Sequence, residues 1–131
     1  MDKKERELAI YRMKESDRAF LSGEALLKID DYRGAINRFY YAAFYATQAL
    51  LILRGKDART HSGNLHLFRQ EYIKTGDFPE ETNQTLSGLF NERLEGDYGF
   101  LEEPDQEEAA QALKSCEAFL GNARKVFRLA V

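Results

Sequence analysis

One stretch of this sequence, residues 32–53, is apolar on almost every face that a helix would present. Its strongest pattern is a seam that alternates steps of four and three residues: Tyr32, Ile36, Phe39, Ala43, Ala46, Leu50 and Leu53. Such steps return to the same face of a helix. Phe44, Leu51 and Ile52 lie outside the seam and make other faces apolar too. We therefore expect a central helix that is covered by several neighbours or by another subunit.

The rest of the sequence predicts four more helices, over residues 3–28, 61–74, 79–95 and 104–129. Thr60 is a candidate N-cap, Gly55 and Gly76 are candidate helix stops, and a proline opens each of the last two helices. The first helix is expected to bury a loose stripe, with Gly23 as its weak point: Leu8, Tyr11, Ala19, Leu26 and Ile29. Short connections favour antiparallel packing, so we predict an all-α, five-helix up-and-down bundle, with residues 1–131 as a single domain.

The composition narrows the cellular setting. Hydrophobic residues make up 44% of the chain and charged residues 31%, which is typical of a globular protein and excludes a disordered one. The single cysteine, Cys116, excludes a disulfide framework, and the N-terminus has no apolar leader, so a cytoplasmic location is expected. The longest uncharged run, residues 39–53, is shorter than the ~20 residues that cross a bilayer, so no membrane span is expected.

Charge is unevenly distributed along the chain. The net charge of −3 excludes a general attraction to nucleic acid. Residues 54–74 are nevertheless rich in basic side chains, whereas residues 77–108 carry eleven acids against Arg93 alone. Two interpretations follow: a locally basic surface beside an acidic one, or two ordinary solvated faces.

A polar stripe interrupts the apolar central helix. It consists of Asn37, Arg38, Tyr40, Tyr41, Tyr45 and Gln48. If buried, these side chains must be hydrogen-bonded, so one interpretation is an internal network that ties helices together. The other interpretation is a cleft in which Arg38 binds a phosphate and the tyrosines stack on bases.

Two further clusters are candidates for chemistry. The first lies around residues 54–66 and contains Arg54, Lys56, Arg59, His61 and His66. Arg59 and His61 lie near a predicted helix N-terminus, which can bind anions, and a histidine there could act as an acid or base. An exposed basic loop is the alternative. The second cluster, which is either functional or a structural ion pair, consists of Asn91, Glu92, Arg93, Asp97 and Tyr98.

Other common site types are missing from the sequence. It has no glycine-rich phosphate loop, no paired-cysteine zinc pattern and no His-Glu-x-x-His motif. We therefore expect no metal and no cofactor. Cys116 stands in an apolar stripe, where a cysteine is usually a small buried hydrophobe rather than a nucleophile.

Residues 31–99 resemble the HEPN domain family, in particular its small stand-alone branch. The resemblance is carried by Asn37-Arg38-x-Tyr40-Tyr41, by Thr60-His61, and by Arg93 followed by Asp97-Tyr98. It implies a five-helix bundle that forms homodimers with a cleft between protomers. It also implies pairing with a minimal nucleotidyltransferase in a toxin–antitoxin system, in which a tyrosine just beyond the motif can be modified with AMP.

Many members of this family are metal-independent ribonucleases that use an Arg-x(4–6)-His motif. In that chemistry the histidine serves as acid or base for attack by the ribose 2′-hydroxyl, and the arginine stabilises phosphate charge. This sequence departs from the motif, because Asp97 stands close to the place of the expected histidine after Arg93. An aspartate is a poor substitute for imidazole near pH 7. Arg54 and His61 match the spacing literally but straddle a glycine loop.

Three functional hypotheses result. The first is a homodimeric module that binds a nucleotide or RNA and pairs with a nucleotidyltransferase. Its expected binding residues are Asn37, Arg38, Tyr41, Tyr45, Arg59, Asp97 and Tyr98. The second is a metal-independent endoribonuclease that acts as a toxin and uses His61 with Arg93 or Arg38. The third is a structural or oligomerising helical domain. The sequence leaves the RNA target, the partner chain, the dimer face and any modified tyrosine open.

Overall fold

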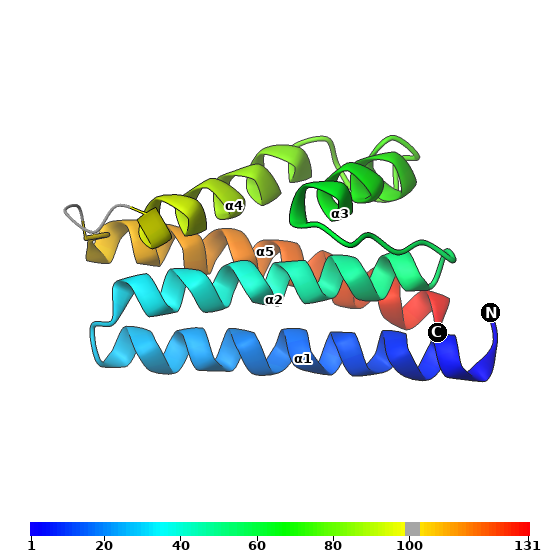
Figure 1. Cartoon of the computed structure of the whole chain (residues 1–131), viewed down its shortest axis with the longest axis horizontal. Coiled ribbons are helices and arrows are strands. Elements are labelled where there is room, and N and C mark those ends of the chain that lie inside the picture. The colour runs from blue at the N-terminus through cyan, green and yellow to red at the C-terminus, as the bar shows by residue number, and fades with distance from the viewer. Residues whose placement is uncertain (99–102) are drawn as a thin grey trace.

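The predicted all-α, five-helix bundle is confirmed. A computed structural model describes the backbone of residues 1–98 and 103–131 and the side chains of residues 1–91 and 103–131. In chain order the elements are α1 (Lys3–Lys28), α2 (Tyr32–Ile52), α3 (His61–Phe68), the π-helical turn η1 (Arg69–Ile73), α4 (Thr82–Tyr98) and α5 (Gln106–Ala130). None of the described residues forms a strand. The long helices α1, α2 and α5 run side by side (Figure 1).

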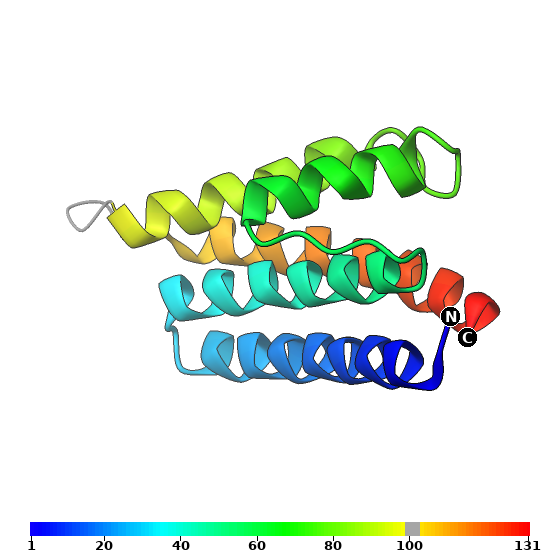
Figure 2. The same cartoon turned by 45° about the vertical axis from the view of Figure 1, so that its right-hand side comes forward.

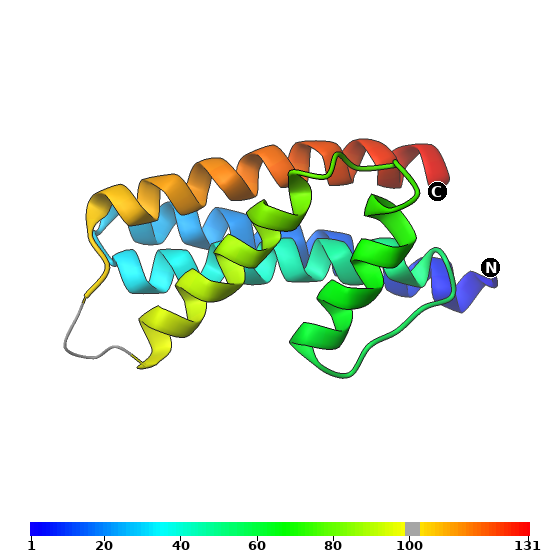
Figure 3. The same ribbon diagram turned by 90° about the horizontal axis from the view of Figure 1, so that it is seen from above.

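Helix α2 lies at the centre, as its all-round apolarity predicts. It contacts α1, α3, α4 and α5. From the middle of its seam, Ile36, Phe39, Ala43, Ala46 and Leu50 are buried. Figure 2 shows α1 below α2, with α3 and α4 above it. Seen from above, α3 and α4 cross α2 slantwise (Figure 3).

The predicted inner stripe of α1 is partly wrong. Ala19 is buried and Leu26 packs against the core, as expected, but Leu8, Tyr11 and Ile29 are 44%, 53% and 72% exposed. The buried face of α1 is instead built mainly from small residues: Ala9, Met13, Ser16, Ala19, Phe20 and Gly23. Small side chains allow α1 to approach α2 closely, and a hydrophobic pattern alone does not reveal such a face.

Gly23, expected to be a weak point, is a contact point between α1 and α2. A Cβ atom at this position would lie 2.5 Å from Phe39 Cε1. That is well inside the ~3.5–4.0 Å at which two carbon atoms attract each other. The ring of Phe39 therefore occupies the space that any other residue at position 23 would need.

Capping side chains determine where most helices begin. Asp2, Asp31, Thr60 and Asp105 each accept a hydrogen bond from a backbone N–H in the first turn of α1, α2, α3 and α5. Such acceptors satisfy amides that have no partner inside the helix. Two predicted starts are slightly early, since α4 begins at Thr82 and α5 at Gln106, each a few residues beyond its proline.

Gly55 and Gly76 act as the expected helix stops. Their φ angles of +70° and +88° lie in the left-handed region that favours glycine. Among the described residues, no helix combines the length and the apolar character needed to cross a membrane.

Candidate functional site

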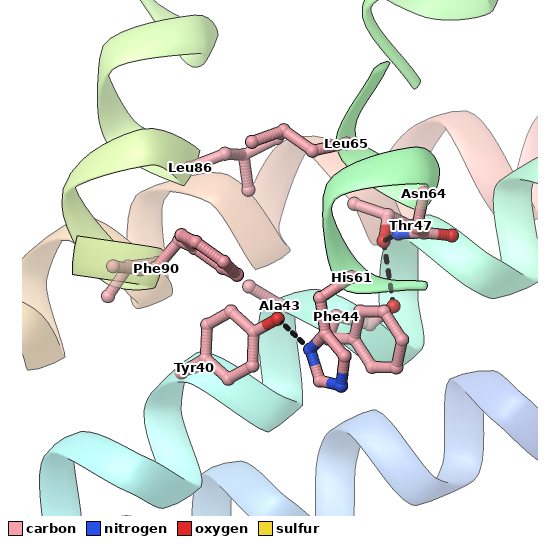
Figure 4. Close-up of a pocket in the computed structure, with 10 residues that line it drawn as sticks. Tyr40, Ala43, Phe44, Thr47, His61, Asn64, Leu65, Leu86 and Phe90 are labelled. Carbon is pink, nitrogen blue, oxygen red and sulfur yellow. Dashed lines mark hydrogen bonds between the residues drawn. The ribbon is translucent and has the colours of Figure 1, made fainter. Parts of the chain in front are cut away.

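His61 lies where α3 begins, directly above the middle of α2. Thr60 caps the helix by accepting a hydrogen bond from the Gly63 N–H at 2.9 Å. The hydroxyl of Tyr40 is hydrogen-bonded to His61 Nδ1 (Figure 4). The imidazole also stacks on Phe44, with ring centroids 4.3 Å apart and planes inclined by 6°. The hydrogen bond from Tyr40 and the stacking on Phe44 therefore help to hold the orientation of the ring.

Arg38 and Tyr41 extend this arrangement along α2. Tyr41 meets His61 edge-on at a centroid distance of 5.8 Å. The Arg38 guanidinium lies over the Tyr41 ring, with Cζ 5.1 Å from its centroid, and Arg38 also donates to Asn37 Oδ1 at 3.2 Å. These three α2 residues are half-buried. The structure thus brings together Arg38, Tyr41 and His61, and two further predicted site residues, Asn37 and Tyr45, contact Arg38 and Tyr41.

A small apolar pocket lies beside His61, between α2, α3 and α4. Its walls include Phe44, Leu65, Leu86 and Phe90 (Figure 4). The free volume is about 20 Å³, which is room for roughly one water molecule. A nucleotide is therefore too large for this pocket.

Thr47 and Asn64, which also line this pocket, connect α3 to α2. Asn64 Nδ2 donates to Thr47 Oγ1, and the Thr47 hydroxyl donates to the Phe44 carbonyl oxygen at 2.7 Å. Both side chains are buried. A buried polar pair that is hydrogen-bonded fixes the register between two helices, and here it fixes the position of His61 at the start of α3.

With this geometry, comparison with known proteins identifies the family. Residues 10–126 match the HEPN domain. The chain belongs to the HEPN family. It is 33% identical to a UPF0332 protein from Thermotoga maritima, over 96% of this chain and 95% of that protein. It is 31% identical to a protein from Methanocaldococcus jannaschii named "Putative toxin", over 86% of this chain and 77% of that protein.

A solved structure has the same fold. The protein TT1696 from Thermus thermophilus superposes on this HEPN chain with a TM-score of 0.76, over 89% of this chain and 96% of that one. The sequences are 20% identical. This likeness concerns the fold alone.

The predicted basic cluster of the HEPN chain is dispersed. Arg54 forms an ion pair with Asp77 at 2.9 Å, and its Cζ lies 3.8 Å from the centroid of the Tyr72 ring. Lys56 lies 3.9 Å from Glu71. These contacts favour a structural role for Arg54 and Lys56. Two members of the cluster, Arg59 and His66, are exposed.

Tyr72, the ring beneath Arg54, is buried and hydrogen-bonded. Its hydroxyl donates to the Leu50 carbonyl oxygen. Burial raises the pKa of Tyr72 to about 12, an effect that the charge of Arg54 partly offsets. Arg54 therefore covers a buried tyrosine, and its described contacts are with Asp77 and Tyr72 rather than with His61.

The motif residues on α4 fall outside the described side chains. Arg93, Asp97 and Tyr98 are among these residues, as is Glu92. Asn91 is exposed. The roles expected of these residues stay predictions.

Tyr40 was predicted as part of the polar stripe of α2 but without a link to His61, and Phe44 was predicted only as part of the apolar surface. In the structure Tyr40 tethers His61 and Phe44 stacks on it. Their spacing of four residues, which puts both on one face of α2, was the available signal. In the described part of the chain, no three side chains of His, Cys, Asp or Glu are placed to hold a metal ion.

Proposed function

We propose that this HEPN chain is a binding module for single-stranded RNA or a nucleotide, and that Arg38, Tyr41 and His61 form its binding surface. One observation carries the proposal: a guanidinium, a tyrosine ring and an oriented imidazole follow one another along α2 and the start of α3. Each of these groups suits a different part of a nucleotide.

The chemistry of the three groups is complementary. The Arg38 guanidinium can donate two parallel hydrogen bonds to a phosphate. Tyr41, with Tyr45 at a centroid distance of 5.8 Å, offers rings on which bases stack. Amides and the dipole at the start of α3 favour an anion beside His61. Arg59, which is exposed and lies two residues before His61, adds a positive charge that would attract the same anion.

We further propose that the module works as a homodimer and pairs with a minimal nucleotidyltransferase. Membership of the HEPN family supports this, and the name of the M. jannaschii relative supports a toxin–antitoxin setting. Light scattering on the purified chain tests the dimer. Co-purification with a nucleotidyltransferase that is co-expressed from the same source tests the pairing.

A second candidate is a metal-independent endoribonuclease that acts as a toxin. The geometry at His61 favours it, because an imidazole fixed by Tyr40 and Phe44 is suited to proton transfer. The imidazole would take the proton of a ribose 2′-hydroxyl as its oxygen attacks the adjacent phosphorus. The bond from that phosphorus to the 5′-oxygen of the next nucleotide would break, leaving a 2′,3′-cyclic phosphate, and the imidazolium would return the proton to the departing 5′-oxygen. Arg38, or Arg93 on α4, would stabilise the charge on the phosphate.

One experiment separates these roles. A fluorescein-labelled RNA octamer is titrated with protein in EDTA, anisotropy reports binding, and a denaturing gel of the same samples reports cleavage. We expect Arg38→Ala to weaken binding about tenfold or more, because hydrogen bonds to charged groups contribute roughly 1.5–3 kcal/mol. Arg18→Ala is the control, since Arg18 is an exposed α1 residue whose described partner is Glu15.

The outcomes differ clearly. Binding without cleavage that Arg38→Ala and His61→Ala both weaken supports the module. Cleavage that His61→Ala abolishes supports the ribonuclease. If wild type binds no RNA and the variants change only the melting temperature, the chain is a structural domain and both proposals are wrong.

A further inference from the structure

Tyr40 makes its hydrogen bond to His61 from inside the protein. Tyr40 is only 5% exposed, and its ring contacts Phe44 and Phe90 at centroid distances of 6.0 Å and 5.8 Å. A buried tyrosine hydroxyl needs a hydrogen-bond partner, and in this apolar setting His61 Nδ1 supplies one. The position of the hydroxyl is therefore set by the packing around Tyr40.

The chemistry of the two groups gives this hydrogen bond a direction. A phenol O–H is a good donor with a weakly basic oxygen, whereas the unprotonated nitrogen of a neutral imidazole is basic and a good acceptor. The favourable arrangement is therefore one in which the Tyr40 hydroxyl donates and His61 Nδ1 accepts. A neutral imidazole carries one hydrogen, and a nitrogen that accepts cannot hold it. The hydrogen then belongs on Nε2, which lies on the side of the ring away from Tyr40 (Figure 4).

The charged groups of the proposed binding surface are donors as well. Arg38 and the exposed Arg59 have guanidinium groups that donate hydrogen bonds and accept none. With its hydrogen on Nε2, His61 is a third donor on this surface. Three donors match the charged oxygens of a phosphodiester, which only accept. The base of the ribonuclease candidate would need the opposite form, with the hydrogen on Nδ1 and none on Nε2.

We infer that Tyr40 is a positioning residue that keeps the hydrogen of neutral His61 on Nε2, so that His61 donates a hydrogen bond to a phosphate oxygen and does not act as a base. The inference rests on the proposed RNA-binding function and specifies which part of the RNA His61 contacts. Because Tyr40 is buried, it makes no contact of its own with RNA. Tyr40 therefore affects binding only through His61.

Nitrogen-15 NMR tests the position of the hydrogen directly. The chain has two histidines, and the exposed His66 serves as an internal reference in the same spectrum. At pH 8 an ordinary imidazole is neutral, and its two kinds of nitrogen, with and without hydrogen, resonate in separate ranges. We expect His61 to show only the form with hydrogen on Nε2, whereas His66 exchanges between both forms. Tyr40→Phe removes the hydroxyl but keeps the ring, so His61 should shift toward the mixture that His66 shows.

RNA affinity tests whether Tyr40 acts through His61. The fluorescein-labelled RNA octamer is titrated with wild type, Tyr40→Phe, His61→Ala and the double variant. We expect Tyr40→Phe to weaken binding about three- to tenfold when His61 is present, the effect of about one hydrogen bond, and less than about twofold in the His61→Ala background. Tyr72→Phe is the matched control, because it also removes a buried hydroxyl, one that donates to the Leu50 carbonyl oxygen. Its affinity should stay within about twofold of wild type.

Each outcome bears on a different claim. Hydrogen on His61 Nδ1 at pH 8 would show that Tyr40 accepts rather than donates, and the inference would be wrong. If Tyr40→Phe has the same effect on affinity in both backgrounds, or none in either, Tyr40 does not act through His61, and the inference is overturned while the proposed function stands. If wild type binds no RNA, the proposed function and the donor role of His61 are both wrong.

Discussion

Replacing Gly23 by alanine should destabilise the bundle, although alanine is the better helix former. The added Cβ would lie 2.5 Å from Phe39 Cε1, 2.7 Å from Cδ1 and 3.0 Å from Cζ. The ring would have to retreat by about 1 Å to reach ordinary contact. Phe39 is fully buried and also contacts Phe20, at a centroid distance of 5.6 Å. Overpacking of this kind costs about 1–3 kcal/mol.

Gly121→Ala is the matched control for this substitution. Gly121 lies in the interior of α5, is exposed, and has no atom within 4 Å of its ideal Cβ position. Both substitutions gain the same helix propensity, up to ~1 kcal/mol. The difference between the two changes in unfolding free energy is therefore the overpacking alone, about 1–3 kcal/mol. Urea denaturation followed by circular dichroism measures both.

The result that would refute this reasoning is simple. If Gly23→Ala stabilises the chain as much as Gly121→Ala does, α1 and α2 are not packed as closely as the structure indicates.

Three further predictions concern other parts of the fold. Hydrogen bonds from Thr75 and Arg54 lower the pKa of Asp77. The ionised carboxylate should therefore stabilise the fold near pH 7, and this stabilisation should be lost as the pH falls through the lowered pKa. The difference in melting temperature between wild type and Asp77→Asn should accordingly be smaller at pH 3 than at pH 7. Burial raises the pKa of Cys116 to about 12, so its thiol should stay protonated at pH 8, and iodoacetamide should label the chain in urea but not when folded. Arg69 donates to Asn83 at 2.9 Å and to Ser87 at 2.8 Å, so Arg69→Ala should lower the unfolding free energy by about 1–3 kcal/mol in urea titrations, whereas an unchanged midpoint would contradict a fastening role for Arg69.

The fold was largely predictable because α2 is so distinctive. Its seam, its start after Asp31 and the glycine stop at Gly55 follow from local chemistry. The inner face of α1 was not predictable in the same way. Gly23 and Ser16 are buried because they face α2, with the Ser16 hydroxyl donating to the Ala42 carbonyl oxygen at 2.6 Å. Which face of one helix packs against another is determined by the tertiary structure. Small residues such as Gly23 and Ser16 leave little trace of that face in the hydrophobic pattern of the sequence.

The candidate site, like the packing of α1, could be predicted from the sequence only in part. Arg38, Tyr41 and His61 stand out as polar or ionisable groups in an apolar setting, so sequence reasoning could select them. Tyr40 and Phe44 become site residues only because the start of α3 brings His61 to them. Arg54 looked equally suitable in the sequence, but Asp77 and Tyr72 hold it in the fold. Only the tertiary arrangement separates these cases.

The buried seam of α2 and the proposed binding surface on the same helix should link stability to binding. Phe39, in the buried seam, directly precedes Tyr40 and follows Arg38, so the three residues share one turn of backbone. A closely packed interior transmits strain rather than absorbing it. If the Phe39 ring is displaced in Gly23→Ala, the backbone that carries Arg38 and the Tyr40 tether should shift with it. RNA affinity should then fall in Gly23→Ala but not in Gly121→Ala, even in conditions where both variants are fully folded. Equal affinity in the two variants would show that a displacement of the Phe39 ring does not change the proposed binding surface.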